Sequence, residues 1–387
     1  RVVDEPFASG ARLATEEASQ GAVVVVDPFS TGAALAALAS SMGYKVVLLF
    51  SERDSPVAAL VSSQHSSMRH HPTVQHDSAN ANEEEALEAT LAGLRALDVP
   101  VMAIIPGAET AVELADKLNA RFGTRGNSLA LTEARRHKFH MHEAVRAKGV
   151  RACMQRDCRT EGEMREFMSG VPSGTNVVVK PAKSAGSDRV YKCANAEEAV
   201  QAFGEICGVT NGLGHMSDSA LVQEFLEGTE YVVDSVSRDG VHKAVAIWEY
   251  DKRDANGRCF LYYSMRLRTV EDPEIRRLVD YAHSVLDALE IFHGASHLEV
   301  KMTSTGPCLV EVGARCHGGE GTWCEIAKEC VGYTQLEEVL NVYLGPPEKF
   351  DGLPKAPESL KKYGAEVFLV SQQTGCVVAI PGEPHVR

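Results

Sequence analysis

Apolar residues in the first third of the chain gather in short unbroken runs, and amphipathic segments separate these runs. Such runs are typical of buried strands, and the amphipathic segments have the spacing of helices. The predicted strands lie at 21–28, 44–50 and 99–106, and the predicted helices lie at 30–43, 83–97 and 109–122. A strand, a helix and a second buried strand form a βαβ unit, so the region to about residue 130 is predicted to be a small α/β domain with a parallel sheet.

This first region also contains a polar stretch and lacks a dinucleotide motif. The stretch at 62–82 is rich in histidine, and we predict a solvated loop there, with a metal-binding tract as the alternative. Because no GxGxxG motif is present, the sequence gives no reason to expect a dinucleotide site in this domain.

After residue 130 the pattern becomes richer in strands. Thr132 is the expected cap of a helix that ends near Lys148, where Gly149 follows. The later strands are predicted at 176–180, 189–193, 220–226, 230–238, 241–250 and 259–268, and the helices at 161–169, 195–207 and 272–290. We therefore expect an α+β half with an antiparallel sheet, followed by a proline-rich tail beyond Gly345.

A hairpin at 297–315, HLEVKMTSTGPCLVEVGAR, carries one glutamate in the middle of each strand. A three-residue loop at 304–306 would set Glu299 opposite Glu311. Side-chain alternation would put both glutamates on the face that also carries His297, Lys301, Gly313 and Arg315. Like charges directly opposite each other destabilise a sheet, so we expect a cation or a function at this position. A slip of one residue would move Glu311 to the other face.

Composition and charge narrow the function classes. The 387 residues suffice for two or three domains, and the net charge of −14 argues against nucleic acid as a general partner. No apolar run approaches the length of a membrane span, and nothing resembles a signal peptide, so we expect a cytoplasmic protein that binds no membrane. Arg1 replaces an initial Met and the chain stops in PGEPHVR, so we expect truncation at both ends, and targeting stays open. The ten cysteines are expected to be reduced.

The segment VVVKPAKSAGSDRV, at 177–190, has the features of a phosphate-binding loop. A strand delivers Lys180, and a loop follows that contains Lys183 with small and hydroxyl residues. Backbone N–H groups of such a loop can cradle phosphate oxygens while a lysine neutralises their charge. The Walker pattern is absent, so this would be a different phosphate grip, and a plain hairpin loop is the alternative.

Two charged segments could serve a nucleotide or its co-substrate. In LVQEFLEGTEYVVDSV, at 221–236, Gln223 and Glu224 could contact an adenine edge and Glu230 a ribose, although a charged turn between two strands explains the same pattern. The run DKRDANGR, at 251–258, is either a solvated hairpin or a source of two cations for a substrate carboxylate.

Taken in order, a lysine-bearing helix, the lysine strand with its Gly/Ser loop, the acidic connector, and the paired glutamates before an arginine resemble the ATP-grasp superfamily. The resemblance covers about residues 20–345. Within it, PGAETAVELADKLNARFGTRGNSLALTEARRHKFHMHEAVRAKGV, at 106–150, and HLEVKMTSTGPCLVEVGARCHGG resemble the branch of bacilysin-type L-amino acid ligases and carnosine synthase. This branch typically has H-x-E-x-K and G-P-x-L-x-E-x-N-A-R in the second segment.

The resemblance implies a fold and its division into domains. The fold would be an α/β N-terminal domain of the pre-ATP-grasp, Rossmann-like type, followed by α+β ATP-grasp domains with antiparallel sheets. The implied division is 1–130 for the first domain, 131–215 for the smaller (lid) subdomain, 216–345 for the larger subdomain with the metal site, and 346–387 for a partial C-terminal subdomain.

The resemblance also implies roles for single residues. Lys138 and Lys180 would hold the α- and β-phosphates of ATP, and Glu230 would bind the ribose. Glu299 and Glu311 would coordinate Mg²⁺, with Mn²⁺ as an alternative, which would explain why two carboxylates face each other. A loop over the phosphates would consist of Lys183, Ser184, Ala185, Gly186 and Ser187, and the adenine pocket of Gln223, Glu224, Phe225 and Leu226.

Arg315 would stabilise the charge of a forming acyl phosphate, and His297 could contact the substrate, although a histidine on a sheet face is more often structural. Two positions depart from the branch pattern. Gly313 stands where an asparagine usually helps to bind a second metal, and His137 replaces an aspartate. The first departure leaves open whether one or two metal ions bind.

The implied activity is that of an ATP-dependent carboxylate–amine ligase, which forms an amide or peptide bond through an acyl phosphate, on amino acids. One alternative is an ATP-grasp carboxylase that uses bicarbonate. Another is a non-catalytic ATP-binding regulatory protein, of which Gly313 would be a symptom. The expected partners are small carboxylate and amine substrates. The oligomeric state stays open, with a homodimer as one alternative because dimers are common in the superfamily.

Overall fold

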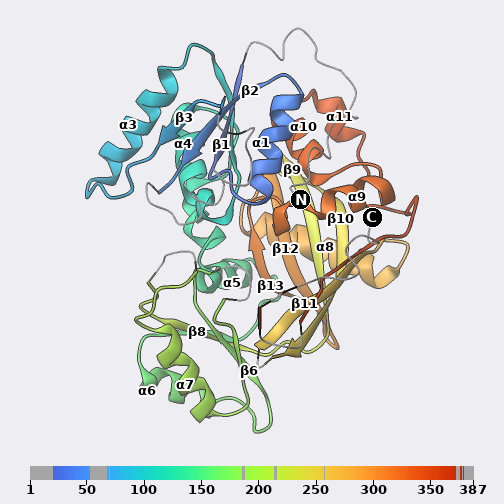
Figure 1. Ribbon diagram of the computed structural model, residues 1–387. Helices are drawn as coiled ribbons and strands as arrows, with labels where there is room; N and C mark the ends of the chain where they lie inside the picture. The colour runs from blue at the N-terminus through green and yellow to red at the C-terminus, as the bar shows by residue number, and fades with distance from the viewer. Residues whose placement is uncertain are drawn as a thin grey trace.

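The computed structural model describes residues 21–52, 68, 70–184, 188–212, 216–256, 258–371, 375–376 and 378. Strands in these ranges form one parallel and two antiparallel sheets. Figure 1 shows the parallel sheet with its helices at the top left, the large antiparallel sheet at the centre, and the small antiparallel sheet below. The predicted combination of an α/β domain with α+β domains is confirmed.

The N-terminal part is a parallel sheet with helices on both faces. Its strands are hydrogen-bonded in the order β3-β2-β1-β4. The bounds are β1 Ala22–Val26, β2 Lys45–Phe50, β3 Thr73–Gln75, β4 Val101–Pro106, α1 Thr31–Ser41, α3 Glu83–Arg95 and α4 Val112–Phe122. Successive valines of β1 point to opposite faces, so Val23 and Val25 share a core with α1, whereas Val24 and Val26 share one with α3 and α4.

Strand β3 lies in the polar stretch for which a loop was predicted, so that prediction is wrong at 73–75. Thr73 and Gln75 are both exposed, and no apolar pattern marks the strand in the sequence. The strand forms because its backbone pairs in parallel with β2. Residues 62–67 and 69 of the same stretch lie outside the described part of the chain.

The small antiparallel sheet has the strand order β5-β8-β6-β7. Its elements are β5 Gln155–Cys158, α6 Glu161–Ser169, β6 Val177–Lys180, β7 Tyr191–Cys193, α7 Ala196–Ile206 and β8 Ala220–Glu224. Helices α6 and α7 cover one face, where Met164, Ala199 and Ile206 pack against Val177 and Val179. No strand was predicted at β5, because its sequence QRDC carries no apolar alternation.

Helix α5 (Lys138–Ala147) precedes the small sheet and begins later than the sequence predicted. The residues before it form two 3₁₀ turns, Leu129–Leu131 and Glu133–Arg135. The Thr132 hydroxyl donates to Asp116 in α4 (3.0 Å) instead of capping a helix. Arg135 also donates to Asp116 and to the carbonyl of Leu289, so these contacts with distant segments hold the chain in a turn.

The large sheet has the order β13-β12-β9-β10-β11-β14, and all of its pairs are antiparallel. Its strands are β9 Thr229–Arg238, β10 Val241–Ala255, β11 Arg258–Leu267, β12 Gly294–Thr303, β13 Gly306–Gly313 and β14 Ala365–Val367. The helices beside it are α8 Pro273–Ala288, α9 Trp323–Cys330, α10 Gln335–Leu344 and α11 Pro347–Asp351. Helix α8 covers one face, with Leu278 packing in the same core as Val233 and Ile247.

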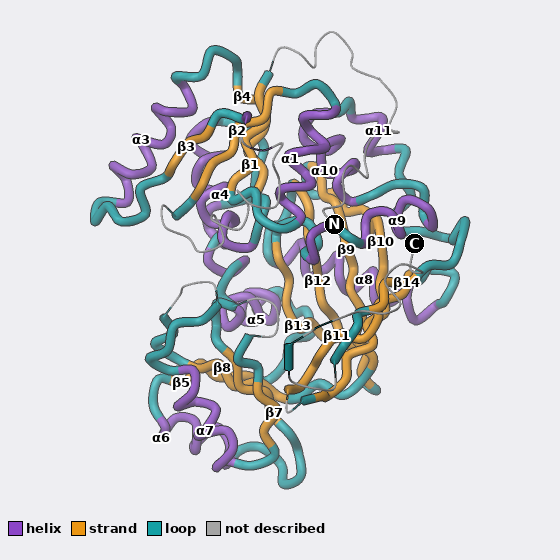
Figure 2. The backbone as a smooth tube through the Cα atoms, in the orientation of Figure 1, coloured by secondary structure: helices purple, strands orange, loops and turns teal. Residues whose placement is uncertain are grey.

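The other face of the large sheet joins the N-terminal domain through a shared core. That core contains Val232 and Trp248 from the sheet, Trp323 from α9 and Leu340 from α10, and it continues into α1. Helices α1 and α10 lie side by side in Figures 1 and 2. None of the helices in the described ranges is long and apolar enough to cross a membrane.

The glutamate hairpin of β12 and β13 has the predicted pairing but a different turn. Thr303 pairs with Gly306, so the loop has two residues rather than the three that were predicted. A bulge between Glu299 and Val300 then adds one residue on β13, and Glu299 lies opposite Glu311 after all. The shorter turn and the bulge compensate each other in register, so both carboxylates face the same side.

Candidate active site

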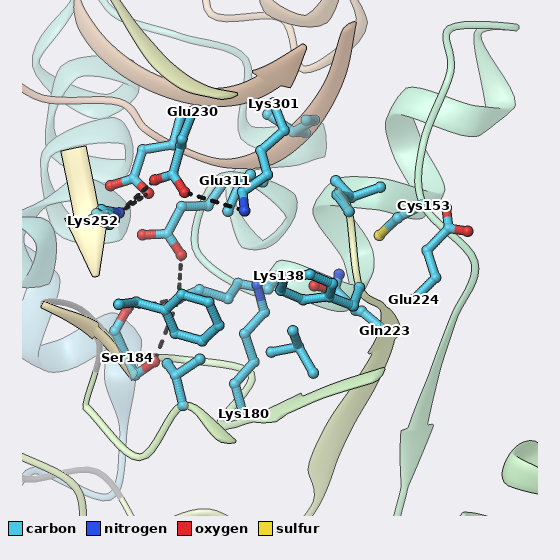
Figure 3. Close-up of a pocket in the computed structure, with 18 of the residues that line it drawn as sticks. Lys138, Cys153, Lys180, Ser184, Gln223, Glu224, Glu230, Lys252, Lys301 and Glu311 are labelled. Carbon is cyan, nitrogen blue, oxygen red and sulfur yellow. Dashed lines mark hydrogen bonds and ion pairs between the residues drawn. The ribbon is translucent and has the colours of Figure 1, made fainter. Parts of the chain in front are cut away.

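A pocket lies between the small sheet and the large sheet. It encloses about 790 Å³ of space, with the open solvent at its mouth included. Figure 3 shows Glu230 and Lys301 entering from the large sheet, and Lys180 and Ser184 from the small one. Lys138 reaches the same space from the first turn of α5. Strands of both sheets and helix α5 therefore build one cavity.

Each of the two opposed glutamates is paired with a lysine. Lys138 Nζ lies 3.0 Å from Glu311 Oε2, and it also donates to the backbone oxygen of Ser184 (2.8 Å). Lys252 Nζ lies 3.4 Å from Glu299 Oε2. The positive charge that was expected between the two carboxylates is thus supplied by two lysine ammonium groups.

Lys252 is held tightly between acidic and aromatic side chains. Its ammonium pairs with Glu230 as well as with Glu299, and lies 4.4 Å from the ring centre of Tyr262 and 5.0 Å from that of Tyr250. Burial alone would lower the pKa of Lys252, but the two carboxylates raise it well above its usual value. The sequence pattern allowed two interpretations of this lysine, a residue of a solvated hairpin or a contact to a substrate carboxylate. The structure places its side chain, which is 10% exposed, in the lining of the pocket.

The lysines and carboxylates of the pocket respond differently to burial. Lys180 is fully buried, and the loss of water lowers its pKa. Burial likewise raises the pKa of Glu230, in spite of its contact with Lys252. For Glu299 the opposing effect of burial is overcome by Lys252 and His297, so its pKa is well below its usual value. Glu299 is therefore an anion in this pocket. A negatively charged ligand group near Lys180 would stabilise the charged form of this lysine.

One end of the pocket is apolar and aromatic. Phe225 and Phe260 stack with ring centres 6.2 Å apart, and the ammonium of Lys301 lies 5.0 Å from the centre of the Phe225 ring. Leu226 and Val178 line the same cavity. An apolar slot next to a charged floor can take a flat heterocycle that carries a charged tail.

Most of the predicted site residues meet in this pocket. Those that line it are Lys138, Lys180, Ser184, Gln223, Glu224, Phe225, Leu226, Glu230, Glu299 and Glu311. Lys183 instead pairs with Glu113 of α4 (2.8 Å). Ala185, Gly186 and Ser187 lie outside the described residues.

Arg315 and His297 are not among the residues that line the pocket. Arg315 Nε donates to Glu109 Oε2 (2.8 Å), which comes from the N-terminal domain. His297 Nδ1 donates to the fully buried carboxylate of Asp234 (2.9 Å), and its Nε2 faces Glu299 Oε1 at 3.6 Å. The structure thus links each of these residues to a glutamate at or near the pocket.

Asp234 is the centre of a buried polar network that the sequence did not reveal. Its carboxylate accepts hydrogen bonds from His297, from His317 Nδ1 (2.8 Å) and from Trp248 Nε1 (2.8 Å). Burial would raise the pKa of Asp234, but the two histidines hold it far below its usual range. Although Asp234, His297 and His317 are close enough to surround a metal ion, their polar atoms already satisfy one another. The network instead fixes the orientation of His297 beneath Glu299.

The donor set of the pocket fits a hard divalent cation. Glu299 and Glu311 offer carboxylate oxygens on one face of the hairpin, and Mg²⁺ commonly binds one or two carboxylates together with phosphate oxygens. Both carboxylates are already balanced by lysines, so a cation that enters must replace or share those contacts.

A small antiparallel sheet and a larger one that enclose a charged pocket define the class of ATP-grasp enzymes. The family model "ATP-grasp domain" matches residues 173–324. Dapdiamide A synthase from Enterobacter agglomerans is 33% identical over 289 residues, which are 74% of this chain and 67% of that protein. The chain belongs to the ATP-grasp superfamily and to its carboxylate–amine ligase branch.

Other relatives are more distant. The L-arginine-specific L-amino acid ligase of Bacillus subtilis is 22% identical over 221 residues, which are 56% of this chain and 52% of that ligase. The solved L-amino acid ligase from Bacillus licheniformis superposes with a TM-score of 0.65 at 17% identity, over 86% of this chain and 77% of that one. The biotin carboxylase domain dimer of Hydrogenobacter thermophilus 2-oxoglutarate carboxylase, solved with MgADP and bicarbonate, gives a TM-score of 0.64 at 14% identity, over 90% and 74%. These likenesses in structure support the fold.

Proposed function

We propose that this protein is an ATP-dependent carboxylate–amine ligase that joins amino acids through an amide bond. The observation that carries the proposal is the pocket itself, in which two opposed carboxylates face two lysines beside an apolar slot. The relatives named as an amino acid ligase and a dapdiamide synthase support the same activity. As in those proteins, the residues would act on small molecules, and the identity of the acid and the amine is left to experiment.

ATP would bind with its adenine in the slot lined by Gln223, Glu224, Phe225 and Leu226. Lys138 and Lys180 would contact the α- and β-phosphates, which would supply the negative charge that buried Lys180 lacks. Glu230 would accept hydrogen bonds from the ribose. The Lys138 ammonium has three N–H donors. It now contacts Glu311 (3.0 Å) and the backbone oxygen of Ser184 (2.8 Å), so a further donor would be available to a phosphate.

Glu299 and Glu311 would hold Mg²⁺, with Mn²⁺ as a substitute. Bound there, the ion would supply charge neutralisation between the phosphates and orient the terminal one. With Gly313 in place of an asparagine, the described residues at this end of the hairpin offer these two carboxylates as the main ligands.

The reaction would proceed in two transfers. The substrate carboxylate attacks the γ-phosphorus of ATP, so a new C–O–P linkage forms and ADP leaves. The amine then attacks the acyl carbon, inorganic phosphate leaves, and the amine loses a proton. Arg315 would neutralise the negative charge that builds on the acyl phosphate, and His297 would hold Glu299 in position from below. Positioning and electrostatics would provide the rate enhancement without a covalent link to the protein.

The remaining parts of the proposal concern the lid and the assembly. The segment 183–188 would close over the phosphates and exclude water, and Lys183 would exchange Glu113 for a phosphate. The four units named above would be residues 1–130, 131–215, 216–345 and 346–387. Strand β8 (Ala220–Glu224) falls in the third range but pairs with β5 and β6 of the small sheet, so we extend the smaller subdomain to Glu224. We also propose a homodimer, as named for one solved relative, and a cytoplasmic setting where ATP is available.

The test is Mg²⁺-dependent ADP release with pooled amino acids and mass-spectrometric detection of products. We expect ADP together with a new amide mass. Glu311→Gln, which keeps the shape and removes the charge, should abolish ADP release, whereas Glu88→Gln on the exposed face of α3 should not change it. ADP release that depends on bicarbonate and gives no amide would point to a carboxylase, and ATP binding without turnover would point to a regulatory protein.

A further inference from the structure

The hydroxyl group of Tyr250 connects Lys252 with the buried polar groups around Asp234. The Tyr250 oxygen lies 3.2 Å from His317 Nε2, and the centre of the tyrosine ring lies 5.0 Å from the ammonium of Lys252. His317 Nδ1 donates to Asp234 (2.8 Å), and burial lowers the pKa of His317, so its Nε2 carries no proton and accepts from the hydroxyl. Lys252 therefore packs against a tyrosine whose orientation depends on Asp234.

Asp234 is connected with Glu299 along two routes. On one route, His297 lies between them, with Nδ1 2.9 Å from Asp234 Oδ1 and Nε2 3.6 Å from Glu299 Oε1. On the other route, the second histidine and the tyrosine lead to Lys252, whose Nζ lies 3.4 Å from Glu299 Oε2. The two routes meet different oxygens of the same carboxylate. We call the residues of both routes the Asp234 network: Asp234, Tyr250, Lys252, His297, Glu299 and His317.

The Asp234 network is built on three neighbouring strands. Asp234 lies on the central strand β9, where it pairs with His297 of β12, and Tyr250 comes from β10 on the other side. Helices α9 and α10 hold His317 from outside the sheet, through a ring contact and a hydrogen bond. Asp234 itself is fully buried, so bulk water does not replace a partner that is lost. Side chains rather than solvent therefore set the position of each Glu299 oxygen.

We propose that Asp234 is a positioning residue for the metal site: through the Asp234 network it fixes both oxygens of Glu299, and it thereby sets the affinity of this carboxylate for the divalent ion that accompanies the nucleotide. Asp234 does not itself line the pocket. A ligand that is already held in place loses less conformational freedom when an ion binds, and removal of such outer partners typically lowers metal affinity by about 10–100-fold. The inference rests on the proposed function and deepens it, because it names the residue that controls the proposed metal site.

The experiment measures metal affinity and nucleotide affinity separately. The first quantity is the Kd for Mg²⁺ of protein saturated with a non-hydrolysable ATP analogue, corrected for Mg²⁺ that binds to free analogue. The second is the Kd for the same analogue in EDTA. For Asp234→Asn, which keeps the shape of the side chain and removes its charge, we expect the Kd for Mg²⁺ to rise by about 10–100-fold while the Kd for the metal-free analogue stays unchanged. Glu299→Gln removes the ligand itself and marks the largest loss of metal affinity to be expected.

Tyr250→Phe tests the second route with a smaller change. This variant removes only the hydroxyl that contacts His317 and keeps the aromatic ring against the lysine. The Kd for Mg²⁺ should rise, but by less than in Asp234→Asn, because the route through His297 stays intact.

Tyr343→Phe is the matched control. It removes the hydroxyl of another tyrosine whose ring contacts a histidine, His293, with 4.8 Å between the ring centres and outside the Asp234 network. Its Kd for Mg²⁺ should equal the wild-type value.

A purely structural role of Asp234 gives a different result. Asp234→Asn would then lower the unfolding free energy and leave the Kd for Mg²⁺ unchanged, or it would weaken the binding of Mg²⁺ and of the metal-free analogue alike. Either result overturns the proposal. If Asp234→Asn fails to fold, Tyr250→Phe decides, because an unchanged Kd for Mg²⁺ in that variant also overturns the proposal.

The binding measurements keep this inference separate from the proposed function. A selective loss of Mg²⁺ affinity in Asp234→Asn, in a protein that forms no amide, supports the positioning role and refutes the ligase. Amide formation by the wild type, together with an unchanged Kd for Mg²⁺ in both variants, supports the ligase and refutes the positioning role. In an active enzyme, excess Mg²⁺ should restore ADP release by Asp234→Asn, and a variant that excess Mg²⁺ does not rescue would overturn the proposal.

Discussion

Replacing Lys252 by Met tests whether the lysine neutralises the two acidic groups at the base of the pocket. The ammonium lies against Glu230 and Glu299, which are 8% and 9% exposed. Methionine would keep the contact with the rings of Tyr250 and Tyr262. It would leave Glu230 with the more distant Lys301 (3.9 Å) and Glu299 with His297 (3.6 Å) as the remaining partners. The folded state should be destabilised, because water cannot replace the lost cation.

After the loss of Lys252, the two carboxylates can stay charged or one of them can take up a proton. The response that costs less free energy sets the size of the effect. Leaving both carboxylates charged after the loss of their shared lysine costs about 3–5 kcal/mol. Protonating one of them at pH 7, from its ordinary pKa of 4.5, costs about 3.4 kcal/mol, since each pH unit above the pKa costs about 1.4 kcal/mol. The variant should therefore lose roughly 3 kcal/mol of unfolding free energy at pH 7. At pH 5.5 the cost of protonation falls to about 1.4 kcal/mol.

The sign of the pH dependence is a second test. In the variant, the carboxyl that takes the proton has a folded pKa above its unfolded value, so its stabilising contribution is present at low pH and lost as the pH rises. The gap between wild type and variant should narrow from pH 8 to pH 5.5. Denaturant unfolding at several pH values measures this difference in unfolding free energy. The control is Lys328→Met, which breaks an exposed ion pair and should lower the unfolding free energy by less than about 1 kcal/mol. A gap under 1 kcal/mol at pH 7, or one that widens on acidification, would refute the reasoning.

Three further predictions concern the phosphate lysine, the buried network and a helix cap. Lys180→Met should leave the ligand-free stability nearly unchanged, because it removes a charge that burial disfavours, yet weaken MgATP binding in calorimetry by more than about 10-fold. Asp234→Asn should lower the unfolding free energy by about 3 kcal/mol, since the histidines lose their buried counter-charge, and should move the imidazole signals of His297 in NMR spectra. Thr334→Ala removes the cap of α10, which accepts from the N–H of Glu337, and should cost about 1 kcal/mol in a denaturant titration.

The sequence predicts the strands well wherever one face or both faces are buried. The β1 run AVVVV is entirely buried, and the predicted strands at β6, β9 and β12 follow the same logic. The misses have a common cause. Strands β3 and β5 carry polar residues and form through backbone pairing with neighbours far along the chain. The start of α5 was misplaced because Thr132 bonds to Asp116 in another helix.

The paired glutamates illustrate how a correct prediction can rest on an incorrect detail. The turn has two residues and not three, and a bulge at Glu299 restores the pairing with Glu311. Hydrophobic patterning fixes which face each glutamate occupies, but no local signal announces the bulge. The side-chain partners of the site residues could not be predicted from the sequence for a related reason. Glu109 lies 206 positions from Arg315, and Asp234 lies 83 from His317, so only the fold brings them together.

The hairpin places two carboxylates face to face, and Lys138 and Lys252 neutralise them. These two lysines make the binding of a metal nucleotide an exchange of cations rather than a simple addition. The phosphates would give Lys138 a second anionic partner, and the divalent ion that accompanies them would neutralise Glu311, so Lys138 and Glu311 would each keep an opposite charge nearby. A divalent ion without a nucleotide lacks this compensation, because Lys138 would lose one partner and gain none. On electrostatic grounds, the nucleotide and the metal should therefore bind cooperatively, with each raising the affinity of the other.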